Sequence, residues 1–95
     1  MPQGEPAQKP RELAVLEELA RVATVEALRD FEPVPENWRR ELALGTLFDG
    51  DDRVFELYVP GARPADAVVI SSARVNRKTK HVEVTITNLA RKGSR

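Results

Sequence analysis

Residues 68–89, VVISSARVNRKTKHVEVTITNL, decide the fold of this chain. In the second half of the stretch, apolar and polar residues alternate: Val82, Val84 and Ile86 against Glu83, Thr85 and Thr87. This period of two is typical of a strand with one buried face. The first half reads as another strand, and residues 76–80 read as a turn. The stretch therefore predicts a β-hairpin with a basic turn.

Upstream of this hairpin, the sequence predicts one helix and a second hairpin. Residues 11–31 place apolar side chains on one helical stripe, namely Leu13, Leu16, Ala20, Ala23, Ala27 and Phe31. Pro33 and Pro35 end the helix, because each proline disfavours helical geometry in the residue before it. Period-two patterns return at residues 38–48 and 54–59, and the Asp49-Gly50-Asp51-Asp52 segment between them predicts a tight turn.

Together these elements predict an α+β domain, in which one N-terminal helix packs on a four-stranded antiparallel meander. Residues 67–76 and 81–89 form the last two strands, and a change of phase at Ser71-Ser72 indicates a β-bulge. We expect residues 11–90 to form the domain. Residues 1–10 are expected to be a disordered tail, and residues 91–95 a short basic tail.

The composition narrows the possible functions. A chain of 95 residues forms one domain with a small core, and the absence of cysteine excludes disulfides and thiolate zinc sites. No apolar run approaches the roughly 18 residues of a membrane-spanning helix, and the first residues lack the pattern of a signal peptide. We therefore expect a cytoplasmic protein that does not associate with membranes.

The charge is unevenly distributed, although the formal net charge is zero. Residues 1–70 carry eight Lys and Arg against fourteen Asp and Glu, whereas residues 71–95 carry seven against one. The basic side chains near the hairpin turn are candidates for partner binding, together with the histidine beside them: Arg74, Arg77, Lys78, Lys80 and His81. Three roles fit these side chains: binding to an acidic protein surface, binding to phosphate groups, or keeping other strands from pairing with the edge of the sheet. Nucleic acid is the least favoured partner, because residues 71–95 offer no aromatic platform for bases.

The helix carries a second candidate surface. Val15, Leu19 and Val22 follow one another at i, i+4 and i+7, beside the main apolar stripe. This line either widens the core or forms a seam for another protein, including a second copy of the chain in a homodimer.

No catalytic or metal-binding constellation stands out. His81 is the only histidine, and without cysteines it cannot supply the usual ligand set of zinc. No motif places an activated nucleophile beside it. Glu41 and Glu56 are expected on an exposed sheet face, which does not supply the burial that tunes a catalytic carboxylate. We therefore predict no catalytic residue, metal site or cofactor.

The segment DRVFELYVPGARPADAVVISSARVN (residues 52–76) and the Val-rich HVEVTITNL (residues 81–89) resemble the small N-terminal domains of copper amine oxidases. The resemblance includes the Gly61-Ala62-Arg63-Pro64 turn, and it implies a cystatin-like fold in which a sheet curls around a helix. In that family the quinone-forming tyrosine and three copper-binding histidines belong to a separate large domain. This chain has one Tyr and one His, so the resemblance implies an accessory module without oxidase activity.

The sequence thus favours a non-catalytic module that binds another protein or a second copy of itself. The alternative is a small enzyme or ligand-binding domain with a pocket between helix and sheet. That pocket would be lined by aromatic side chains, namely Phe31, Trp38, Phe48, Phe55 and Tyr58. A cavity of roughly a few hundred Å³ with convergent polar groups would favour the alternative.

Overall fold

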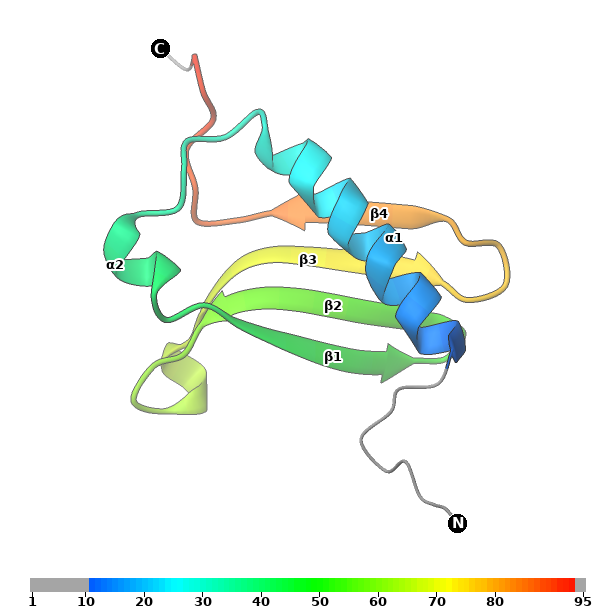
Figure 1. The fold of residues 1–95 in the computed structure, drawn as a ribbon. Helices are drawn as coiled ribbons and strands as arrows, with labels where there is room; N and C mark the ends of the chain where they lie inside the picture. The colour runs from blue at the N-terminus through cyan, green and yellow to red at the C-terminus, as the bar shows by residue number, and fades with distance from the viewer. Residues whose placement is uncertain (1–10, 94–95) are drawn as a thin grey trace.

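A computed structural model describes residues 11–93 of the chain. One long helix, α1 (Arg11–Leu28), lies across a four-stranded antiparallel sheet (Figure 1). The strands are neighbours in chain order: β1 (Ala43–Asp49), β2 (Asp52–Val59), β3 (Val68–Asn76) and β4 (Val82–Ile86). The predicted α+β fold, a helix on an antiparallel meander, is confirmed. The predicted disordered tail, residues 1–10, lies outside the described residues, as do residues 94–95 of the predicted basic tail.

The core lies between α1 and the middle of the sheet. Leu16 is fully buried and Ala20 is nearly so, as the predicted helical stripe required. Both belong to a cluster with Phe55, Ala73 and Val75, and partly buried side chains surround it: Leu13, Leu19, Val82 and Val84. The small side chains of Ala20 and Ala73 let the helix approach the strands closely, so burial of apolar surface holds α1 in place.

The pairing register divides the side chains between the two faces of the sheet. Pairs on the face toward α1 include Leu44 with Leu57, Phe55 with Ala73, and Val75 with Val82. The register shifts between Leu57 and Tyr58, which pair with Ser71 and Val69 and leave Ile70 as the extra residue. The bulge therefore lies one residue before the predicted Ser71-Ser72 site.

Two connections differ from the sequence-based expectation. Trp38, predicted to open the first strand, belongs to a short helix, α2 (Glu36–Arg39), which follows Pro35. Pro35 and Glu36 suit a helix start, because proline fixes a helical φ and an acidic side chain favours the N-terminal end. A 3₁₀ turn, η1 (Pro64–Asp66), links β2 to β3.

The predicted turn at Asp49–Asp52 is a two-residue hairpin loop. Asp49 pairs with Asp52, and Gly50 adopts φ +60° in the left-handed region that glycine favours. The loop lies at the same end of the sheet as the β3–β4 turn, because β2 and β3 are antiparallel neighbours.

The chain after β4 returns to the end of α1. The N–H of Glu32 donates to the Ala90 carbonyl at 2.7 Å, and the N–H of Lys92 donates to the Asp30 carbonyl at 2.9 Å. The Arg91 guanidinium lies 5.0 Å from the centre of the Phe31 ring. The first residues of the predicted basic tail therefore pack against the segment that follows α1.

The helix covers only part of the sheet. With its side chains a helix is about 10 Å wide, and neighbouring strands lie about 4.8 Å apart, so one helix covers roughly two of four strands. α1 packs mainly on β3 and β4 (Figure 1). The face of β1 toward the helix stays open, with Leu44 and Phe48 exposing 57% and 65% of their surface.

Candidate functional site

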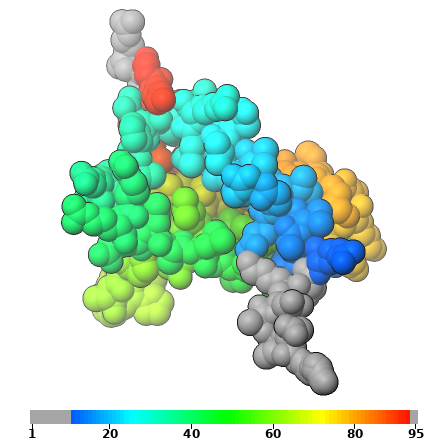
Figure 2. All heavy atoms as spheres, in the orientation of Figure 1, coloured from blue at the N-terminus to red at the C-terminus, as the bar shows by residue number. Residues whose placement is uncertain are grey.

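An apolar groove lies between α1 and the open half of the sheet. It encloses about 290 Å³. Figure 2 shows the hollow, with strand atoms visible between α1 and β1. Its lining comes from the second half of α1 and from three strands: Glu17, Ala20, Arg21, Thr24, Val25, Leu28, Leu44, Phe55, Leu57 and Ser71.

The groove follows from the size of the side chains that α1 turns toward it. Ala20 and Thr24 are one helical turn apart and are short, so they leave space above the strands. Val25 and Leu28 form the helical wall, and the paired Leu44 and Leu57 form the floor. The result is an apolar surface that α1 itself cannot cover.

Few polar groups reach the groove. Ser71 is 2% exposed on the strand floor, and within residues 11–93 its hydroxyl makes no hydrogen bond. Arg21 is held by Glu18, one turn earlier on α1, and the hydrogen bond from Arg21 keeps the pKa of Glu18 below its ordinary value. The groove has the volume expected of a ligand pocket, but its lining is mainly apolar.

The aromatic residues predicted to line such a pocket lie mostly elsewhere. Phe55 does form part of the floor. Phe48 instead packs under the Arg53 guanidinium, at 4.4 Å from the ring centre, and Trp38 lies in α2. The prediction was wrong for Trp38 because the first strand begins only after α2. It was wrong for Phe48 because α1 leaves β1 uncovered, although Phe48 lies on the predicted face of the strand.

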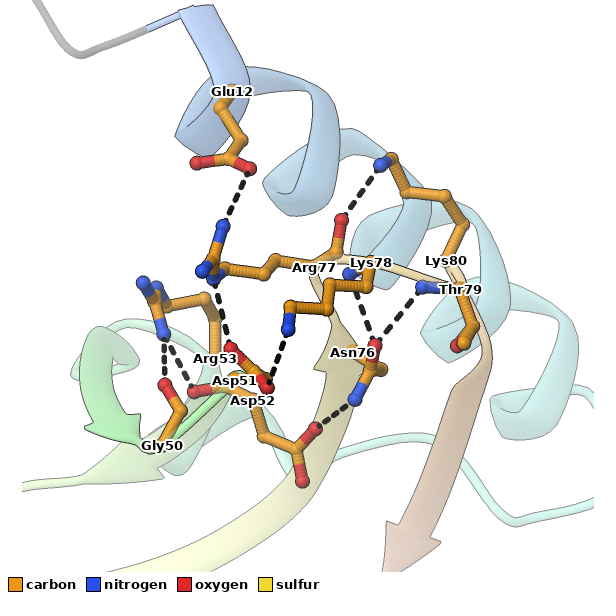
Figure 3. A network of polar contacts seen from close by, with 10 residues as sticks. All are labelled: Glu12, Gly50, Asp51, Asp52, Arg53, Asn76, Arg77, Lys78, Thr79 and Lys80. Atoms are coloured by element: carbon orange, nitrogen blue, oxygen red, sulfur yellow. Dashed lines mark hydrogen bonds and ion pairs between the residues drawn. The ribbon is translucent and has the colours of Figure 1, made fainter.

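The predicted basic cluster is paired with acidic side chains of the neighbouring turn (Figure 3). The Arg77 guanidinium lies 3.1 Å from the Asp51 carboxylate and 3.7 Å from that of Glu12 on α1. The Lys78 ammonium lies 3.5 Å from Asp51. Arg74 lies 2.8 Å from Asp52 and 3.0 Å from Asp49. The charge asymmetry of the sequence is therefore largely balanced in space at this end of the sheet.

The rest of the predicted cluster also has partners within the domain. The Lys80 ammonium donates to the Arg77 carbonyl at 2.7 Å, and His81 lies 3.5 Å from Glu83. The side-chain oxygen of Asn76 accepts from the N–H groups of Lys78 and Thr79, each at 2.9 Å. These contacts hold the turn in shape, and no sequence pattern distinguishes Asn76 from the rest of the turn.

The three residues of the second predicted surface, on α1, do not lie together in the structure. Leu19 packs at the margin of the core, whereas Val15 and Val22 are exposed on the outer side of α1. Val25 and Leu28, which are not part of the predicted surface, face the groove. On a helical wheel of about 100° per residue, Leu28 lies about 100° from the centre of the core stripe and Val25 lies almost opposite it, so periodicity alone placed neither residue in the core.

A second hollow, of about 370 Å³, lies on the sheet face away from α1. It is lined by polar side chains, namely Asp52, Arg74, Asn76, Thr79, His81 and Glu83. Arg74 and Asn76 both donate to the carboxylate of Asp52, at 2.8 Å and 3.0 Å. The acidic and basic side chains of this hollow bind one another, so their role is to stabilise the fold.

The Asp52 contacts predict a pH dependence of stability. The hydrogen bond from Arg74, assisted by that from Asn76, holds the pKa of Asp52 below its ordinary value of 3.8. Because the folded-state pKa is the lower one, ionised Asp52 stabilises the fold above that value, and this contribution is lost as the pH falls through the folded-state pKa. We expect Asp52→Asn to be less stable than the unmodified protein at neutral pH, with the difference shrinking below about pH 4.

Urea unfolding at a series of pH values measures this difference. An Arg74→Met background serves as the control, because removing the main donor should reduce the effect of Asp52→Asn. A stability difference that stays constant from neutral to acidic pH would contradict the assignment.

The comparisons with known proteins add no relative. No protein-family model, curated protein or solved structure matches this chain. Within residues 11–93, no three His, Asp or Glu side chains are grouped to hold a metal ion. The helices in that range also lack the length of apolar sequence needed to cross a membrane.

Proposed function

We propose that this domain is a non-catalytic protein-binding module, and that its apolar groove receives an amphipathic helix of another protein. One observation carries the proposal: α1 covers half of the sheet and leaves an apolar half open beside it. Leu44 and Phe48 are exposed there although they point to the same side of the sheet as the core. Large apolar side chains gathered on one exposed face are typical of interaction surfaces.

The dimensions of the open face suit a helix. The two uncovered strands span about 10 Å, which is close to the width of one helix. A bound helix would place apolar residues at i, i+3 or i+4, and i+7 against Leu44, Leu57 and Val25, as in other helix-in-groove complexes. Such a partner would complete a layer of two helices on the sheet.

The groove is a better docking surface than the basic hairpin. Arg74, Arg77 and Lys78 already bind acidic residues of this chain, so a partner would have to compete with those contacts. The sequence-based likeness to amine-oxidase accessory domains agrees with a binding role without chemistry. We also propose a cytoplasmic location, because a chain without cysteine is suited to a reducing compartment.

A small apolar ligand is the second candidate occupant. Ser71 supports it, because its buried hydroxyl would gain a partner from a ligand with one polar group. The groove is open along β1, however, and its lining offers few polar groups to orient a small molecule.

The test uses peptides selected from a display library of helices with apolar residues at heptad spacing. Bound peptides are expected to lose affinity about tenfold or more on the Val25→Gln variant, because this residue forms the groove wall. Val22→Gln is the matched control, since Val22 and Val25 lie on the same helix with 49% and 47% exposure, and Val22 does not line the groove.

Glutamine is used at both positions because a charged side chain would meet neighbours of opposite charge at Val25 and at Val22. Val25 has Arg21 and Arg29 one turn away, whereas Val22 has Glu18 and Glu26. Equal loss of affinity in both variants, or failure to select any helical binder, would reject the helix-in-groove function. Binding of 1-anilinonaphthalene-8-sulfonate that only Val25→Gln weakens, without peptide binding, would favour the small-ligand candidate.

A further inference from the structure

The outer edge of β1 lacks the protections that sheet edges usually carry. Monomeric proteins block edge strands with lysine, proline, a bulge or short length. β1 has seven residues, contains no Lys or Pro, and pairs with β2 in one continuous register. The opposite edge, β4, has five residues and lies under α1. Of the two edges that residues 11–93 form, β1 is therefore the better suited to accept another strand.

The hairpin loop fixes which backbone groups of β1 face outward. A two-residue loop makes the flanking pair Asp49 and Asp52 a hydrogen-bonded pair. Hydrogen-bonded and non-hydrogen-bonded pairs alternate along an antiparallel ladder. The backbone N–H and C=O groups of Leu44, Thr46 and Phe48 therefore point away from β2. Within residues 11–93 these groups have no hydrogen-bond partner, so they form a row of free donors and acceptors along the edge.

We propose that β1 pairs antiparallel with β1 of a second copy of this chain, about a two-fold axis at Thr46. Thr46 is the middle residue of the strand, so this register overlaps the strand along its whole length. The outward groups of Thr46 then bond to those of the partner's Thr46, and Leu44 faces the partner's Phe48. The two sheets become one continuous sheet, with both α1 helices on the same face.

The sequence of β1 is complementary to itself in this register. Leu44 and the partner's Phe48 form an apolar cross-strand pair on the face toward the helices, and the two-fold axis repeats it. On the other face, the exposed Leu47 lies opposite the partner's Gly45. The Tyr58 ring of each chain lies 3.3 Å from the position of a Cβ on its own Gly45, so Leu47 would pack against that ring. A slip by one residue would turn the helices to opposite faces and break the Leu–Phe pairs.

Single-cysteine crosslinking tests the register directly, because the natural chain contains no cysteine. Thr46→Cys places two thiols opposite each other across the axis, within the usual separation of about 5.5 Å between Cα atoms. We expect mild oxidation to give a covalent dimer. Leu47→Cys is the control: it lies on the other face and meets the partner's Gly45, so it should crosslink far less.

The unmodified protein should sediment as a dimer, and Thr46→Pro should raise the dimer dissociation constant by at least about tenfold. Proline removes an outward N–H and leaves the bonds to β2 intact, and circular dichroism checks that the fold persists. Thr46→Lys is the second variant, since it keeps the N–H but sets two like charges opposite each other.

A monomeric unmodified protein, or equal crosslinking through Thr46→Cys and Leu47→Cys, would overturn this inference and leave the edge to a strand of a different protein. This outcome can be distinguished from that of the helix-in-groove test, although both surfaces include Leu44. Crosslinking depends on Thr46 of β1, whereas the peptide test depends on Val25 of α1.

Discussion

Replacing Leu16 with alanine should lower the free energy of unfolding by about 2–5 kcal/mol. Leu16 is fully buried and packs against Phe55, Ala73 and Val75, so the truncation removes apolar burial and leaves a cavity between helix and sheet. Domains of this size have total stabilities of about 5–15 kcal/mol, so the variant should be close to unfolding at moderate urea. Urea titration followed by circular dichroism measures the loss.

Val22→Ala on the same helix provides the control for Leu16→Ala. Val22 is exposed on the outer side of α1, so its truncation should change the unfolding free energy by less than about 0.5 kcal/mol. Alanine also has the higher helix propensity, which works against any loss. Similar losses in both variants would mean that α1 does not pack on the sheet through the Leu16 face.

The sequence predicted the features of the fold that depend on local periodicity. Leu16 and Ala20 could be assigned to the core because the helical stripe repeats over several turns. The alternation in β4 predicted its orientation, with Val82 and Val84 against the core. The short helix α2 was missed, because four residues are too few for a period and Trp38 also fitted the alternation that follows.

The groove could not be predicted from the same patterns. It depends on where α1 crosses the sheet, and this follows from contacts between residues far apart in the chain. Leu44 had the pattern of a buried strand residue, and its exposure reflects what α1 leaves uncovered. The widths of a helix and of a strand predict that one helix covers about half of a four-stranded sheet, but they do not predict which half.

The charge balance was missed for a related reason. Arg77 and Asp51 are 26 positions apart in the sequence and meet because β2 and β3 are antiparallel neighbours. The predicted meander already placed the two turns at one end of the sheet. Pairing the acidic turn with the basic turn was therefore possible from topology, and it would have shown that a basic segment need not be a basic surface.

Gly61→Ala should lower the unfolding free energy by about 1–3 kcal/mol, for a steric reason. An added Cβ would lie 2.5 Å from the Asp66 Cβ and 2.8 Å from the Asp66 carbonyl carbon and oxygen. Asp66 cannot retreat freely, because its N–H donates to the Arg63 carbonyl and its carboxylate binds the Arg63 guanidinium. The loop between β2 and β3 would have to open, and urea unfolding measures the loss.

Two further variants separate crowding at Gly61 from other costs of adding a side chain to glycine. In an Asp66→Gly background the nearest atom is gone but the backbone carbonyl stays, so Gly61→Ala should cost less without becoming neutral. Gly50→Ala is the control, because its Cβ would meet open space and its cost, about 1–2 kcal/mol, comes from the left-handed φ. Asp66→Gly should leave the Gly50→Ala cost unchanged. If Asp66→Gly reduces the stability losses of Gly61→Ala and Gly50→Ala equally, the loss at Gly61 reflects chain flexibility, and close packing of the loop does not explain it.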